Sequence, residues 1–151
     1  MALRRFSVAL AVTAGAYSNG DVIGGRLQLH GIGGPPGIRL HNIVIADKAA
    51  QSVDYLLTFM DAAPTDIADN AALSTMADAD AAKIIWEKTV DAATYRRTRT
   101  ANSNHEVDGL DQPLMSNEAD GDLWLFLSIS SGTPTFASTS DVTITLVFSP
   151  F

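Results

Sequence analysis

Apolar and polar residues alternate along much of this chain with a period of two, which is typical of a β-strand with one buried face. The clearest alternation covers 141–148, and Pro150 stops it. Residues 123–129 are apolar on both faces, which predicts a central strand. Together with less regular apolar runs, the pattern predicts about seven or eight strands. Further strands are predicted at 25–30, 38–45, 53–60 and 84–90, and residues 95–100 are predicted to form a more polar strand or a loop.

Residues 4–12 show the same alternation, with Phe6, Val8 and Leu10 on one face. This pattern predicts an N-terminal strand. A secretory signal peptide is the alternative, because Arg4 and Arg5 precede a short apolar run that small residues follow. The strict alternation favours the strand, and the signal peptide stays open as the second interpretation.

A turn is predicted at Asn19-Gly20, because glycine adopts a positive φ without a steric penalty from Cβ. Gly24 and Gly25 follow at the entry to the strand 25–30. An adjacent glycine pair at such a place predicts a β-bulge or the close approach of another backbone. Nothing in this stretch suggests catalysis.

Three connections between the predicted strands differ in composition. The short polar link between 38–45 and 53–60 predicts a hairpin. Residues 66–82 are rich in alanine and aspartate without alternation, which predicts short helical turns capped by Asp69 and Asp78. Residues 101–117 contain asparagine, glycine and proline, and we expect them to form a long exposed connection.

The order of these elements has no βαβ rhythm and no fixed repeat. A chain of 151 residues with 46% hydrophobic and 18% charged residues is expected to fold as one globular domain. The sequence therefore predicts an all-β fold, an antiparallel β-sandwich of jelly-roll type with one short helical insertion, over 1–151.

Charge and composition exclude several classes of function. The formal net charge of −7 disfavours a nucleic-acid partner, whose phosphates require clustered lysine and arginine. The chain contains no cysteine, which rules out disulfides, thiolate metal sites and cysteine nucleophiles. It also contains no apolar run of the roughly 18 residues that a membrane span needs, so no membrane partner is expected.

Candidate chemical groups each have a simpler structural explanation. Glycine-rich 31–37 precedes a strand, whereas a phosphate-binding loop precedes a helix. The triplet Glu118, Asp120 and Asp122 has a composition that is ordinary for a turn. Five other acidic residues lack the spacing of a calcium-binding loop; they are Asp61, Asp66, Asp69, Asp78 and Asp80. The histidines are too dispersed for a catalytic or metal site; they are His30, His41 and His105. No metal, cofactor or enzymatic activity is predicted.

Aromatic residues leave a binding role open. Trp124 lies in the most apolar strand and is expected in the core, whereas Tyr17 beside the turn and Tyr95 beside three arginines are expected to be exposed. Exposed aromatic rings stack on sugars, so the alternative function is a carbohydrate- or receptor-binding jelly-roll module of a phage tail fibre or lectin type, with Tyr17 and Tyr95 as ligand-binding residues.

Several phrases of the sequence, in this order, resemble small virion structural proteins of tailed bacteriophages, of the capsid decoration or cement type. They are YSNGDVIGG at 17–25, the Gly/Pro loop, IAD at 45–47, LTFMDAAP at 57–64 and GTPTF at 132–136. The resemblance covers most of the chain, but it consists of turn-and-strand phrases and contains no catalytic signature.

The resemblance implies a non-enzymatic jelly-roll protein that forms a homotrimer on the outer capsid surface of a virion. There it would stabilise the shell by bridging subunits of the major capsid protein. Broad contact of this kind needs no reactive group. The residues expected at the capsid or subunit interface are Arg4, Arg5, Tyr17, Asn19, Gly24, Gly25, Pro35 and Pro36.

Overall fold

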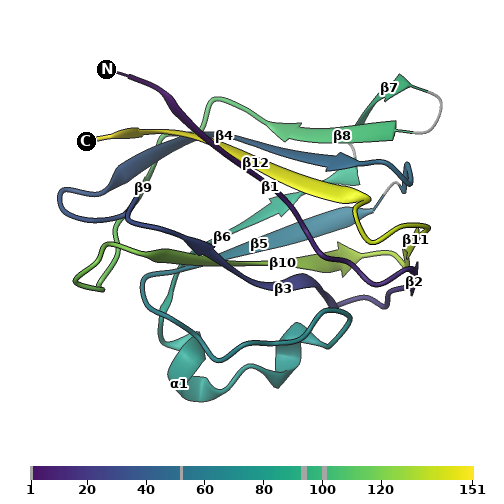
Figure 1. Cartoon of the computed structure of the whole chain (residues 1–151), viewed down its shortest axis with the longest axis horizontal. Coiled ribbons are helices and arrows are strands. Elements are labelled where there is room, and N and C mark those ends of the chain that lie inside the picture. The colour runs from purple at the N-terminus through teal and green to yellow at the C-terminus, as the bar shows by residue number, and fades with distance from the viewer. Residues whose placement is uncertain (1, 52, 93–94, 100–101) are drawn as a thin grey trace.

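The computed structural model describes residues 2–51, 53–92, 95–99 and 102–151, with the backbone alone for 95–99. Two antiparallel sheets pack face to face (Figure 1). The first has the order β1 (Arg4–Ala9), β12 (Val142–Pro150), β4 (Ile38–Asp47), β8 (Asn102–Val107) and β7 (Tyr95–Arg99), and β9 (Gln112–Leu114) also pairs with β4. The second has the order β3 (Val22–Leu29), β10 (Leu123–Ser131), β5 (Asp54–Met60) and β6 (Ile84–Val90). A short pair joins β2 (Gly15–Ala16) to β11 (Thr135–Phe136).

The strand pairing identifies a jelly roll. Four antiparallel pairs are nested along the chain, β5 with β6, β4 with β8, β3 with β10 and β1 with β12. The pattern is that of one long hairpin wrapped over itself so that its pairs alternate between two sheets. This confirms the fold class. The predicted hairpin is wrong, because β4 and β5 lie in opposite sheets and the link between them crosses from one sheet to the other.

The main core lies between the two sheets. The alternation at the C-terminal end is confirmed, since Val142, Ile144, Leu146 and Phe148 are all buried. β10 lies between β3 and β5, and its first seven residues are buried on both faces, as a central strand requires. Burying each large aliphatic or aromatic side chain contributes about 1.5–3 kcal/mol, so this core is the main source of stability.

A second apolar cluster covers the outer face of the sheet that contains β10. It consists of Val22, Met60, Ile67, Trp124 and Phe126. The segment that supplies Ile67 contains a 3-10 helix, η1 (Leu73–Thr75), and a short helix, α1 (Asp78–Ala81); it lies against this sheet in Figure 1. The helical insertion is therefore confirmed and acts as a cover for one sheet, and Trp124 is buried as predicted.

Two local expectations are wrong. Neither helical turn has a side-chain cap, and α1 begins after Ala77. Residues 101–117 were expected as an exposed connection, but they contain β8 and β9. Ser103 and His105 of β8 are buried, because alternate residues of a strand face the core whether or not they are apolar.

The N-terminal alternation forms β1, which pairs with β12 from Arg4 opposite Phe148 to Ala9 opposite Thr143. Phe6 and Val8 pack against the core and Leu10 is buried. Within the described residues, no helix has the length and apolar character to cross a membrane.

Candidate functional site

Tyr17 is a core residue. Its side chain is 1% exposed and packs edge-on against Phe136, with the ring centroids 5.1 Å apart. Its hydroxyl donates a hydrogen bond to Asp69 at 2.7 Å, and burial together with this bond raises the pKa of the hydroxyl. The expectation of an exposed Tyr17 is therefore wrong, because the hydrophobic contact with Phe136 and the distant carboxylate hold the ring inside. A buried ring offers no surface to a sugar, a subunit or a shell.

Asp69 connects the helical insertion to the N-terminal stretch that contains Thr13, Tyr17 and Gly24. Its carboxylate accepts hydrogen bonds from the Thr13 N–H at 2.7 Å, the Thr13 hydroxyl at 2.6 Å and the Gly24 N–H at 2.6 Å, in addition to Tyr17. Burial raises the pKa of Asp69, but the hydrogen bonds outweigh burial and the net pKa is lowered. The ionised carboxylate therefore fastens the helical insertion to the N-terminal segment.

The glycine pair forms the predicted bulge. Gly24 and Gly25 have φ of 74° and 72°, and the register between β3 and β10 shifts there. A Cβ on Gly24 would lie 2.8 Å from Leu10 Cβ, and one on Gly25 would lie 3.4 Å from Asp66 Oδ1. The backbone is thus approached closely, but by this same chain, so the pair is accounted for without a neighbouring molecule.

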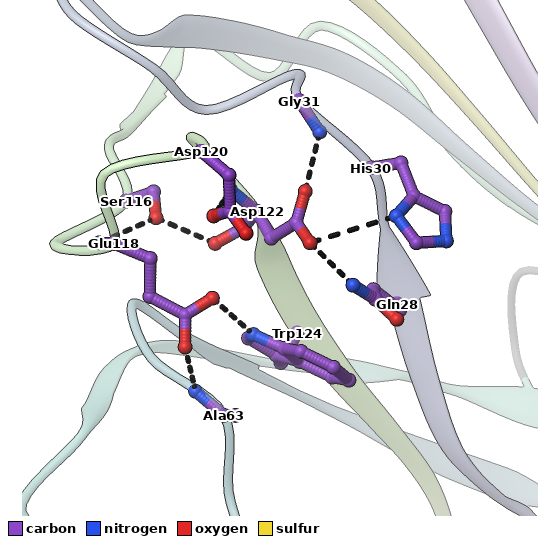
Figure 2. A network of polar contacts seen from close by, with 9 residues as sticks. All are labelled: Gln28, His30, Gly31, Ala63, Ser116, Glu118, Asp120, Asp122 and Trp124. Atoms are coloured by element: carbon purple, nitrogen blue, oxygen red, sulfur yellow. Dashed lines mark hydrogen bonds and ion pairs between the residues drawn. The ribbon is translucent and has the colours of Figure 1, made fainter.

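Glu118, Asp120 and Asp122 bring carboxylate oxygens within 4.8 Å of one another, the one such group in the part of the chain that the structure describes. Figure 2 shows the polar network around them. Glu118 accepts hydrogen bonds from the Ala63 N–H at 2.7 Å and the Trp124 indole at 3.0 Å. Hard cations prefer oxygen ligands of this type, but here backbone and side-chain donors already occupy both oxygens of Glu118.

Asp122 is the most buried of the three acids at 4% exposure. It accepts hydrogen bonds from the Gly31 N–H at 2.7 Å and from the Gln28 amide, and His30 lies 3.5 Å away (Figure 2). The Gly31 and Gln28 hydrogen bonds lower the pKa of Asp122. The network therefore pins the loop before β10 to the loop after β3 and to Ala63, which is a structural role.

The histidines do not converge. His30 is exposed beside Asp122, and His105 is buried edge-on against Tyr55, where burial lowers its pKa. His41 Nε2 lies 2.8 Å from Ser149 Oγ. A serine and a histidine are two of the three members of a catalytic triad, but Ser149 is 0% exposed and no substrate reaches its hydroxyl.

The remaining predicted interface residues lie at two ends of the sandwich. Asn19 is exposed in the turn before β3, at the same end as Tyr17 and the glycine pair. Arg4 and Arg5 are exposed on β1, and Pro35 and Pro36 are exposed in the loop before β4. β1 begins and β12 ends on the side of the molecule where this loop lies (Figure 1).

That side of the molecule carries exposed apolar residues that the sequence pattern did not predict. Met115 is 54% exposed and Phe151 is 45% exposed. They meet at Gly37, where an added Cβ would lie 3.3 Å from Met115 Cβ and 3.4 Å from Phe151 Cε2. We name Pro35, Pro36, Met115 and Phe151 the terminal patch. The sequence does show these apolar residues as isolated positions in polar or terminal stretches. It does not show that residues from such distant segments lie in contact.

Arg39 supports the terminal patch. Its guanidinium lies 4.6 Å from the centroid of the Phe151 ring and 2.7 Å from Asp111 Oδ1. A cation over an aromatic face is attracted to the ring, so the exposed Phe151 side chain is held in place.

The carbohydrate-binding alternative rested on Tyr17 and Tyr95. Tyr17 no longer supports it, because its ring is buried. The side chain of Tyr95 lies outside the described residues.

Searches with known proteins identify no family. No family model and no curated protein matches this chain. Among solved structures, one of deformed wing virus carrying the GFP gene has 9% identity and a TM-score of 0.41, over 98% of this chain and 75% of that chain. A second structure of deformed wing virus, a honeybee pathogen, has 11% identity and a TM-score of 0.28, over 96% of this chain and 46% of that chain. A human norovirus GI.7 particle has 11% identity and a TM-score of 0.23, over 93% of this chain and 28% of that chain.

Proposed function

We propose that this chain is a non-enzymatic virion structural protein that decorates the outer surface of a bacteriophage capsid. It stabilises the shell by bridging subunits of the major capsid protein, and it acts as a homotrimer. The terminal patch is the observation that carries the proposal, with the resemblance of the sequence phrases to decoration proteins and the jelly-roll topology as further support.

The terminal patch has the properties of a protein-binding surface. Large apolar side chains that gather on the surface of a soluble domain mark interaction sites. Here Met115 and Phe151 come from different segments, and Arg39 holds the Phe151 ring in position. A pre-positioned aromatic anchor loses little conformational freedom on binding, so the terminal patch suits a contact with a flat protein shell.

The exposed arginines of β1 supply a second part of the proposed contact. Arg4 and Arg5 lie near the beginning of β1, on the side of the molecule that carries the terminal patch. Asn19 is exposed at the opposite end and would belong to a separate contact. Tyr17, Gly24 and Gly25 are left out of the interface because their surroundings are filled by this chain.

Replacing both Met115 and Phe151 with serine is expected to weaken binding to capsids that lack this protein by more than tenfold, since loss of an interface anchor costs about 2 kcal/mol or more. Co-sedimentation with such capsids measures the effect. The melting temperature of the variant should stay close to wild type, because both side chains are exposed. Ile85→Ser is the matched control, a 37% exposed apolar residue on β6. Equal binding by the double variant and the wild type would remove the terminal patch from the contact.

A further inference from the structure

β3 lies at one edge of its sheet, with β10 as its neighbour on the inner side. An edge strand presents a row of N–H and C=O groups that can pair with a strand of another molecule. On β3 these groups face residues 64–73 of the helical insertion, which we name the edge segment (Figure 1). Leu73, at the end of the edge segment, bonds to Gly20 just before β3. Pro64, at its beginning, bonds to Arg26 within β3, so the edge segment runs antiparallel to the strand.

Backbone atoms make the first part of this contact. Three hydrogen bonds of 2.8 Å are formed, by the Val22 N–H with the Ala71 carbonyl, by the Asn70 N–H with the Val22 carbonyl and by the Leu73 N–H with the Gly20 carbonyl. Asp21 and Ala72 lie opposite each other as an antiparallel bridge. The pattern is that of two neighbouring antiparallel strands, so the edge segment occupies the place that an added strand would take.

Carboxylates continue the contact at the glycine bulge and beyond it. The Gly24 N–H donates to Asp69 at 2.6 Å, and the Arg26 N–H donates to Asp66 at 2.9 Å. A β-bulge bends the strand that carries it and interrupts the regular ladder, and here Gly24 and Gly25 form that bulge. A side chain reaches the N–H groups of a bent edge where a straight neighbouring backbone would not. The edge donors on both sides of the bulge therefore have acceptors in the edge segment.

We infer that the edge segment is an edge cap, which prevents β3 of one copy of this chain from pairing with β3 of a second copy. Two identical strand edges can pair about a two-fold axis, because each offers the donors and acceptors that the other needs. Occupation of those groups within the chain closes this route to association. The cap acts through the acceptor oxygens of its carboxylates rather than through their negative charge. This inference concerns the free protein and does not depend on the proposed contact with a capsid.

Two double variants separate the acceptor atoms from the charge. Asp66→Ala/Asp69→Ala and Asp66→Asn/Asp69→Asn remove the same two charges, but asparagine keeps a side-chain oxygen that accepts hydrogen bonds. Light scattering is expected to give the alanine variant at least twice the mass of wild type, in a fraction that grows with protein concentration. The asparagine variant should keep the wild-type mass. The wild-type mass is the reference in both cases, so the outcome does not depend on the proposed homotrimer.

Hydrogen exchange locates the contact between copies. The Gly24 and Arg26 amides should exchange faster in the dilute alanine variant than in wild type, and they should become protected again when the variant associates. Ile144→Ala is the control for a loss of stability alone, because it truncates a fully buried side chain of β12 in the other sheet. Its mass should equal that of wild type.

A folded alanine variant with the wild-type mass would overturn the inference. Equal association of the alanine and asparagine variants would overturn it as well, because the lost charge would then be the cause. If the alanine double variant does not fold, Asp66→Ala and Asp66→Asn repeat the comparison at the single amide of Arg26, where Asp66 is exposed. Equal masses for these two single variants would likewise contradict an edge cap.

Discussion

Replacing Asp69 with alanine is expected to lower the free energy of unfolding by about 3 kcal/mol or more, since each buried donor left unpaired costs about 1–3 kcal/mol. The substitution removes the acceptor for the Gly24 N–H and for the Tyr17 hydroxyl, and one of the two acceptors of the Thr13 N–H. Tyr17 is 1% exposed, so water cannot replace the lost carboxylate without opening the core. Urea unfolding measures the change.

Asp66→Ala is the matched control, because this exposed residue of the same segment accepts a hydrogen bond from the Arg26 N–H at 2.9 Å. We expect a loss of about 0.5–1.5 kcal/mol for it, the usual net value of one hydrogen bond. If Asp69→Ala and Asp66→Ala destabilise the protein equally, Asp69 does not hold the insertion in the way described.

The stability that Asp69 provides also depends on pH. Because the folded-state pKa of Asp69 is lowered, its contribution is fully present above the unfolded pKa of about 3.9. It is lost as the pH falls from there through the lower folded-state pKa. Asp69→Asn removes this titration, so the variant should lose less stability than wild type over that acid range.

Gly24→Ala is expected to destabilise the protein by about 3 kcal/mol, combining the strain of a positive φ with overpacking. Gly24 has φ of 74°, and an added Cβ would lie 2.8 Å from Leu10 Cβ. Gly109→Ala is the matched control, with φ of 65° and nothing within 4 Å of the added Cβ. We expect about 1 kcal/mol for Gly109→Ala from strain alone. Comparing the two variants by thermal and urea unfolding isolates the contribution of the contact with Leu10. Equal losses of stability in Gly24→Ala and Gly109→Ala would show that this contact contributes nothing.

Local patterns predicted the strands well because burial on one face imposes a period of two. β6 occupies the expected residues 84–90, and the inward side chains of β12 are those of the alternation. The glycine pair predicted the bulge for a similarly local reason, since a positive φ is a property of the backbone at that residue.

Features that depend on distant segments were not predictable in this way. A short link such as 48–53 gives no sign of whether it joins strands in one sheet or crosses to the other, so the hairpin of β4 and β5 was wrong. Tyr17 is buried by Asp69, 52 residues away, and by Phe136. In the terminal patch, Met115 and Phe151 likewise lie close together at Gly37, and no periodicity of the sequence encodes that proximity.

The terminal patch and the exposed arginines of β1 form the surface that we propose meets the shell. A contact there would explain why a chain with an ordinary buried core also carries the exposed apolar residues Met115 and Phe151 at one end.

Imaging of virus particles assembled with and without this protein tests the decoration role most directly. We expect density matching the jelly roll on the outside of the shell, in groups of three that touch neighbouring major capsid subunits, and we expect it to disappear when the protein is left out. Identical shells with and without the protein, or density on the inner surface, would contradict the decoration role.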